Sequence, residues 1–172
     1  MKPAPSPSLD AALKDVLESI PRPEHGLPEP VFRFLLKVTP MINVDLLVRD
    51  ADGRHLLAWR EDEYGEGWHI PGGIIRVNET MADRIRETAR LELGATVEAE
   101  PMPCDVKQFF QNRGHFISLL FRCRLTSSIE VAEEESADGK RTPGELKWFS
   151  SVPHNLLSVH KVYAEWLSGL SL

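Results

Sequence analysis

Hydrophobic and polar residues alternate along two stretches of the chain, and a period of two predicts β-strands. In residues 41–49 the even-numbered positions from Ile42 onward form one apolar face, whereas Asn43 and Asp45 lie on the other. In residues 116–125 the odd-numbered positions form the apolar face. An acid in mid-strand needs a partner or a polar environment. Asp45 is therefore either a salt-bridged or solvated residue, or part of a site.

Shorter apolar runs predict further strands at residues 55–60, 68–70, 95–100, 104–111 and 145–150. Residues 50–53, with the sequence Asp-Ala-Asp-Gly, predict a hairpin turn between the first two strands. Residues 61–67 and 126–144 are polar and predict loops. The second loop is rich in glutamate, so it is either a solvated loop or a lid over a site.

Helical spacing of apolar residues predicts helices over residues 9–20, 80–93 and 153–170. Thr80 and Asp83 form a capping-box pattern at the start of the second helix, with Asn78 as an alternative N-cap. Gly94 stands where a helix would end in a left-handed residue. Four prolines between positions 21 and 30 predict an extended arm after the first helix.

The order of strands, helix, strands and helix favours an α/β fold, in which helices cover the two faces of a mixed sheet as an α/β/α sandwich. We divide the chain into an N-terminal helix with a proline-rich arm, residues 1–36, and a main domain, residues 37–172. The apolar face of the first helix packs either on the main domain or on a second subunit.

The composition bounds the class of protein. A chain of 172 residues suits one domain with a substantial core. The net charge of −6 argues against a general nucleic-acid-binding surface. No apolar run is long enough to cross a membrane, and residues 1–7 lack the apolar region of a signal peptide. Cys104 and Cys123 show no metal-binding spacing, which together with these features fits the cytoplasm.

The candidate chemistry centres on a pair of glycines and one acid. Gly72 and Gly73 precede the second helix, and glycines allow a tight turn and a close approach to a ligand. Within that helix Ile85, Ala89 and Glu92 share a face, so the carboxylate of Glu92 lies on or beside the buried stripe. An unpaired charge there is costly, and a bound cation would relieve the cost.

Residues 73–95 resemble a Nudix box. The family pattern is Gly, five residues, Glu, seven residues, then Arg-Glu-apolar-any-Glu-Glu-any-Gly-apolar. The residues that match it in register are Gly73, Glu79, Glu92, Gly94 and Ala95. The middle departs from the pattern, because Glu87 stands in place of the arginine, and Thr88 and Leu91 stand in place of metal-binding glutamates. The box is therefore degenerate.

One branch of that family, the GDP-mannose mannosyl hydrolases, also keeps only the last glutamate of the cluster. Residues 39–45 and 56–60 resemble the first two strands of that branch, and residues 158–160 and 163–164 resemble its last helix. The resemblance extends over residues 37–167. It implies a Nudix fold, a homodimer, and a nucleoside diphosphate sugar as substrate.

The resemblance also implies a metal site and roles for several acids. Mg²⁺, with Mn²⁺ as an alternative, would be held by the carboxylate of Glu92 and the backbone carbonyl of Gly72. Asp45 matches an acidic substrate contact of the branch. Glu79 more often supports the loop and helix than takes part in chemistry.

Arginine suits a diphosphate because its planar fork donates two hydrogen bonds. Arg60 matches an arginine of the branch, whereas Arg76 lies at a different position and is either a phosphate ligand or a surface residue. The branch uses a histidine before the last strand as general base, but residues 141–145 contain none. His115 matches another histidine of the branch and is either a substitute base or a turn residue without function. His69 is expected to be a structural neighbour of the site.

These observations leave more than one function open. The first hypothesis is a Mg²⁺-dependent hydrolase of a nucleoside diphosphate sugar, similar to GDP-mannose, or of a related derivative. The second is a Nudix domain that has lost turnover and binds a nucleotide or a partner. A third keeps catalysis but cuts the diphosphate itself, and the missing glutamates count against it.

Overall fold

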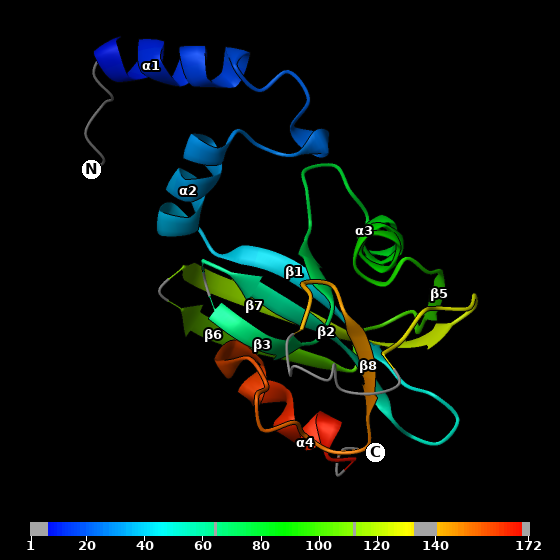
Figure 1. Ribbon diagram of the computed structural model, residues 1–172. Coiled ribbons are helices and arrows are strands. Elements are labelled where there is room, and N and C mark those ends of the chain that lie inside the picture. Colours follow the sequence, from blue (N-terminus) through cyan, green and yellow to red (C-terminus); the bar gives the residue numbers. More distant parts are fainter. Residues whose placement is uncertain (1–6, 64, 112, 133–140, 170–172) are drawn as a thin grey trace.

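The computed structural model describes residues 7–63, 65–111, 113–132 and 141–169, which form two β-sheets with helices around them (Figure 1). In chain order the elements are α1 (Pro7–Glu18), the 3₁₀-helix η1 (Pro23–His25), α2 (Glu29–Val38), β1 (Met41–Val48), β2 (His55–Asp62), β3 (Gly65–His69), β4 (Gly72–Ile74), α3 (Met81–Thr88), the π-helix η2 (Ala89–Leu93), β5 (Val97–Ala99), β6 (Asp105–Gln111), β7 (Gly114–Leu125), β8 (Leu146–Phe149), the 3₁₀-helix η3 (Ser158–Tyr163) and α4 (Ala164–Leu167).

The larger sheet is mixed, as predicted. Its strand order is β4-β1-β7-β5, and β6 also pairs with β7. Strands β1 and β7 run parallel, whereas β4, β5 and β6 pair antiparallel with their neighbours. The smaller sheet has the order β3-β2-β8. In Figure 1, α3 lies on one side of the sheets and α4 on the other, which gives the expected α/β/α arrangement.

Two hydrophobic cores separate these layers, and the alternation along β1 assigns its residues to them. Val44 and Leu46 belong to the core that also contains Ile85 of α3. Leu47 belongs to the core that contains Tyr163 and Leu167 of the C-terminal helices. The two faces predicted for β1 are therefore confirmed, and Asn43 and Asp45 lie on the face opposite Val44.

The N-terminal arm is not extended throughout, because α2 covers residues 29–38. Its prolines do not prevent the helix, since Pro28 is the N-cap and Pro30 lies in the first turn, where a missing N–H costs nothing. The helix runs across the predicted division at residue 36. Leu36 is buried, and a Cβ at Gly114 would lie 2.7 Å from the carbonyl oxygen of Leu36. Helix α2 therefore packs closely on β7.

The helix predicted at residues 153–170 is shorter than expected. Among residues 153–169, which the structure describes, the helical ones are those of η3 and α4, because the preceding residues pair with β3. The N–H of Trp68 donates to the carbonyl of Asn155 at 3.0 Å, and the N–H of Leu157 donates to the carbonyl of Trp68 at 2.8 Å. These backbone groups are therefore committed to a bridge rather than to a helix.

The loop predicted at residues 61–67 is also largely strand. β2 continues to Asp62 and β3 begins at Gly65, so the two strands form a long hairpin. Residues 133–140, the centre of the predicted polar loop or lid, lie outside the described residues.

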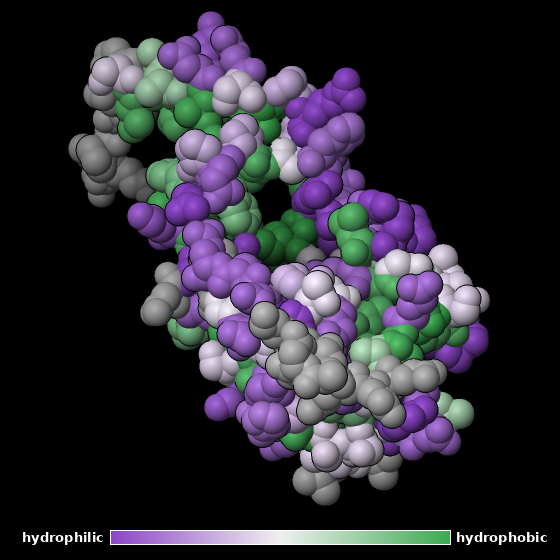
Figure 2. Space-filling model, viewed as in Figure 1, coloured by the Kyte–Doolittle hydropathy of each residue, from purple (hydrophilic) through white to green (hydrophobic). Residues whose placement is uncertain are grey.

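Helix α1 stands away from the sheets (Figure 1). Its apolar residues Leu9, Leu13, Val16 and Leu17 are exposed. Figure 2 shows hydrophobic side chains along the N-terminal segment. Within the described ranges, no helix combines the length and the hydropathy that crossing a membrane requires.

Candidate active site

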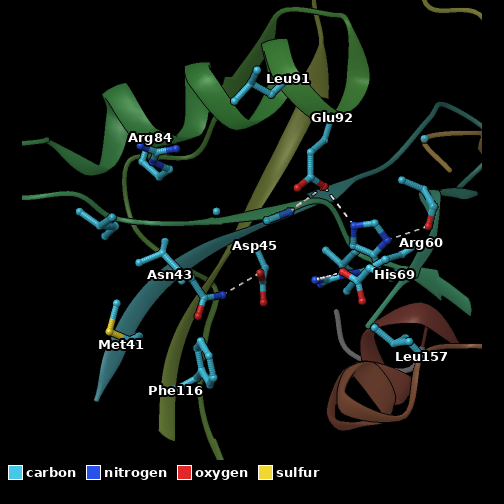
Figure 3. Close-up of a pocket in the computed structure, with 18 of the residues that line it drawn as sticks. Met41, Asn43, Asp45, Arg60, His69, Arg84, Leu91, Glu92, Phe116 and Leu157 are labelled. Atoms are coloured by element: carbon cyan, nitrogen blue, oxygen red, sulfur yellow. Dashed lines mark hydrogen bonds and ion pairs between the residues drawn. The ribbon is translucent and has the colours of Figure 1, made fainter. Parts of the chain in front are cut away.

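A cavity of about 1910 Å³ lies between the sheets, the N-terminal segment and the helix α3 with its continuation η2. It brings together most of the residues that the sequence singled out: Asp45, Arg60, Gly72, Gly73, Arg76, Glu92 and Gly94. Figure 3 shows Asp45, Arg60 and Glu92 around this space. His115 is not among the residues that line the cavity.

The two glycines form a strand rather than the tight turn that was predicted. Gly72 and Gly73 belong to β4 and pair with β1, and neither has a positive φ. Their small size is nevertheless required. A Cβ at Gly72 would lie 2.2 Å from Oδ1 of Asp45, and one at Gly73 would lie 2.6 Å from Oγ1 of Thr88. The glycines therefore allow a buried acid and the helix to approach the edge strand.

The pairing of β4 directs the polar backbone groups of Gly72 away from β1. The N–H of Leu46 donates to the carbonyl of Pro71 at 2.8 Å, and the N–H of Ile75 donates to that of Ile42 at 2.9 Å. Hydrogen-bonded and non-hydrogen-bonded pairs alternate in an antiparallel ladder. Gly72, opposite Asp45, is therefore a non-hydrogen-bonded position. Since β4 is an edge strand, the N–H and C=O of Gly72 point outward from the edge of the sheet.

Glu92 lies beside the core stripe and faces the edge strand. The segment from Ala89 to Leu93 is a π-helix, a form that often occurs at functional sites. Leu93 takes the core position in this turn and is buried, whereas Glu92 is turned toward the cavity. Its Oε2 accepts the N–H of Gly72 at 3.3 Å and lies 3.1 Å from Nε2 of His69. Both contacts use Oε2, which leaves Oε1 for a ligand.

His69 holds Glu92 in place. Its Nδ1 lies 2.8 Å from the carbonyl oxygen of Ala58, which can only accept, so Nδ1 carries a proton. Its Nε2 faces the carboxylate of Glu92, which also can only accept, so the ring donates to both oxygens when both of its nitrogens carry protons. Next to it His160 is buried, and burial lowers the pKa of His160 to about 3. His160 is therefore neutral, and its Nδ1 accepts the N–H of Ile70 at 3.1 Å.

The charged side chains at the start of α3 are paired. Glu79 accepts two hydrogen bonds from the buried guanidinium of Arg84, at 2.7 and 2.8 Å, and a third from the N–H of Arg76 at 2.8 Å. Arg84 lies three residues before Glu87, the position of the family arginine, and so on the same side of the helix. Glu87 itself pairs with Arg90 on the surface.

Asp45 is almost completely buried, with 3% of its surface exposed. It accepts hydrogen bonds from Asn43 at 2.9 Å, from Tyr163 at 2.8 Å and from Ser118. Burial raises the pKa of the Asp45 carboxyl to about 6, although these hydrogen bonds and the nearby His69 oppose the rise. The acid joins β1, β7 and the C-terminal 3₁₀-helix, and it lies directly beneath Gly72.

The remaining candidates lie in different places. Nε of Arg60 is held 2.6 Å from a carboxylate oxygen of Asp62 at the cavity wall. A guanidinium nitrogen of Arg76 donates to the carbonyl of Glu24 at 3.3 Å, which ties the arm to the loop before α3. His115 lies on the hairpin of β6 and β7, hydrogen-bonded to Gln108 at 2.8 Å. The structure therefore does not bring His115 to Glu92.

Sequence reasoning missed Arg84, Ser118 and Tyr163. Tyr163 lies 118 residues from Asp45, and no local pattern connects them. Arg84 could have been recognised, because it is an arginine on the helix side where the family arginine is missing. Asn43 could have been recognised as well, because it shares the polar face of β1 with Asp45.

The donor set suits a weakly held magnesium ion. Among the described residues no group of three or more histidine, cysteine, aspartate or glutamate side chains could enclose a metal. Oε1 of Glu92 and the outward carbonyl of Gly72 are both oxygen donors at one edge, and Mg²⁺ needs few protein ligands because it keeps several waters. Leu91, which replaces a glutamate of the family, lines the same cavity and is 57% exposed.

The chain is similar to several known proteins. The family model described as NUDIX domain matches residues 39–166. The chain is 33% identical over 124 residues to the low-salt glycan biosynthesis protein Agl8 of Haloferax volcanii, covering 67% of this chain and 79% of that protein. It is 32% identical over 106 residues to a MutT-like protein of Streptomyces ambofaciens, and the match covers 61% of this chain and 66% of that protein.

Among solved structures, one described as a possible asymmetric diadenosine tetraphosphate hydrolase from Jonesia denitrificans has a TM-score of 0.61. Its sequence is 19% identical, and the match covers 77% of this chain and 97% of that one. At this identity the likeness shows the fold alone.

Proposed function

This chain belongs to the Nudix domain family, and from that premise we propose that it is a Mg²⁺-dependent hydrolase of a nucleoside diphosphate sugar, of the GDP-mannose type, or of a related nucleoside diphosphate derivative. The observation that carries the proposal is Glu92, which lies beside the edge strand at the cavity with one carboxylate oxygen bound and the other available. Glu79, in contrast, has both of its carboxylate oxygens paired within the protein.

Glu92 and the carbonyl of Gly72 would hold the ion, and Mn²⁺ could replace Mg²⁺ in the same oxygen site. When bound, the ion neutralises the diphosphate and orients the leaving group. His69 keeps Glu92 directed at this edge, and the N–H of Gly72 fixes the same carboxylate oxygen. Because the protein supplies so few ligands, metal affinity is expected to rise when a diphosphate completes the coordination shell.

Arg60 and Arg76 line the cavity and would bind the diphosphate, for which a planar guanidinium is well suited. Asp45 would act as a substrate contact through the groups it orders, since its own carboxylate is buried beneath Gly72. A sugar-linked substrate is supported by the name of the Haloferax volcanii relative, which places that protein in glycan biosynthesis.

The exposed apolar face of α1 supports the proposal of a homodimer. Leu13 and Leu17 lie on a helix that stands away from the sheets, and burying such a face against a second copy would stabilise the pair. Light scattering that gives the mass of two chains would support this assembly, and the mass of one chain would exclude a stable dimer.

The direct test is a Mg²⁺-dependent assay over a panel of nucleoside diphosphate sugars, with Glu92→Gln as the matched variant. We expect turnover by the wild type that Mg²⁺ removal abolishes and that Glu92→Gln loses. Release of free sugar identifies cleavage at the sugar carbon, whereas release of sugar phosphate identifies cleavage between the phosphorus atoms.

A second candidate function is binding of a nucleotide or partner without turnover. It is favoured by Thr88 and Leu91, which remove two of the carboxylates that the family uses for metal. No product from any compound of the panel, together with measurable nucleotide binding, would establish this second function in place of the first.

A further inference from the structure

The cavity continues from Glu92 to a second end that is mainly hydrophobic and aromatic. This end is lined by the arm, α2 and the hairpin of β6 and β7, with the residues Leu27, Val31, Phe32, Phe109, Arg113 and Phe116. Figure 2 shows a hollow between the N-terminal segment and the body of the protein, with hydrophobic residues around it. Leu27, Val31 and Phe32 precede the residues matched by the family model, so this wall is added to the family domain.

Planar side chains follow one another along this wall. The rings of Phe109 and Phe116 are stacked, with centroids 5.8 Å apart and planes at 17°. The guanidinium carbon of Arg113 lies 5.8 Å from the ring centroid of Phe116 and 5.5 Å from that of Phe32. Aromatic faces and guanidinium planes are the surfaces on which nucleobases stack.

A hydrogen-bond acceptor lies between this wall and the edge strand β4, where Glu92 and Gly72 form the proposed metal site. The Nδ2 of Asn43 donates to Asp45 at 2.9 Å and to Ser118 at 3.0 Å, which fixes the orientation of the amide. Its Oδ1 has no partner in the part of the chain that the structure describes. Asn43 lines the cavity, and in Figure 3 it lies between Asp45 and Phe116. A buried acceptor without a partner is costly, and a donor on a ligand would satisfy it.

The register of the larger sheet gives the separation of the two ends. Phe116 lies opposite Met41, whereas Gly72 lies opposite Asp45, four residues further along β1. At the rise of a β-strand this is about 13 Å. A nucleotide whose phosphates lie at Gly72 would extend its base toward Phe116.

Resting on the proposed function, we propose that this aromatic end binds the nucleobase of the substrate. The base stacks on the half-buried ring of Phe32 and the guanidinium of Arg113, and a ring N–H or amino group donates to Oδ1 of Asn43. The N-terminal segment is then part of the substrate site, and it sets which nucleotides the family domain accepts.

The test measures nucleotide binding by calorimetry, without metal and without turnover. We expect GMP or AMP to bind at least about 10-fold more tightly than ribose 5-phosphate, which lacks a base. Phe32→Ala is expected to weaken that binding at least about 5-fold. Phe32→Leu keeps an apolar side chain without the ring and is expected to weaken it as well. Phe110→Ala is the matched control, because this ring is 75% exposed on the same hairpin and does not line the cavity.

Equal affinities of wild type and both Phe32 variants would overturn the inference, provided that melting temperatures show all variants to be folded. Failure of both GMP and AMP to bind would overturn it as well. The outcome is separate from the hydrolase proposal. Without turnover of any sugar nucleotide, binding that depends on Phe32 would still support the base site. Turnover with a KM that Phe32→Ala leaves unchanged would contradict it.

Discussion

The segment that enters α3 and the segment that leaves it are built in opposite ways. At the start, Thr80 and Asp83 form a capping box, and Glu79 is enclosed by Arg84 and the N–H of Arg76. At the end, Glu92 is bound through one oxygen only. The first region therefore holds the loop and helix together, whereas the second presents a carboxylate with one oxygen outside these contacts. The metal binding that we propose depends on Glu92.

The largest effect on stability is expected from the first region. Arg84→Met leaves the carboxylate of Glu79 partly buried without its main partner, and breaking a buried ion pair costs about 3–5 kcal/mol. Arg90→Met is the matched control, because the pair of Arg90 and Glu87 is exposed and is worth at most about 1 kcal/mol. Urea denaturation measures both changes. Equal losses for the two variants would show that Glu79 and Arg84 do not support the box.

The next effect is the change in the free energy of unfolding with pH that Asp45, the buried acid beneath Gly72, should cause. The pKa of Asp45 is about 6 in the folded protein and 3.8 ordinarily. Because the folded value is raised, its contribution to stability is complete below about pH 4 and is lost as the pH rises through about 6, a change of about 3 kcal/mol.

Asp45→Asn should therefore flatten the fall in the free energy of unfolding between about pH 4 and 7. The measurement is urea denaturation of wild type and variant across that range. Parallel pH profiles for the two proteins would contradict the prediction.

A smaller effect, an increase in metal affinity, is expected from adding a carboxylate beside the proposed metal site. Leu91 precedes Glu92 in the sequence and is exposed at the cavity, so Leu91→Glu adds a second carboxylate at the proposed metal site. We expect Mn²⁺ affinity to increase about tenfold, since affinity follows the charge and number of oxygen ligands. Met81→Glu adds the same charge at an exposed position of α3 away from the cavity, and it should leave the affinity unchanged. An equal increase in both variants would indicate a general charge effect.

The sequence predicted the strands and their faces better than it predicted the site. The alternation in residues 41–49 and 116–125 predicted which side chains face each core, because successive side chains of a strand point to opposite faces of the sheet. The helix of residues 29–38 was missed because its prolines indicated an arm, although they lie where a helix begins.

Contacts between distant residues could not be predicted. The π-helical turn that directs Glu92 toward Gly72 depends on a shift in the hydrogen bonds of the backbone, which the side-chain pattern does not encode. The support of Asp45 by Tyr163 depends on how the C-terminal 3₁₀-helix packs. The role of Gly72 and Gly73 was attributed to a turn, whereas they make room for Asp45 and Thr88.

The most direct test of the central claim is the binding of Mn²⁺ in the presence of GDP, followed by electron paramagnetic resonance, in wild type and Glu92→Gln. The substitution keeps the size and removes the charge of the side chain. We predict that the wild type binds the ion and that the variant, with an unchanged melting temperature, binds it at least about tenfold more weakly. Equal Mn²⁺ affinities for the two proteins would contradict the assignment of Glu92 as the metal-binding carboxylate.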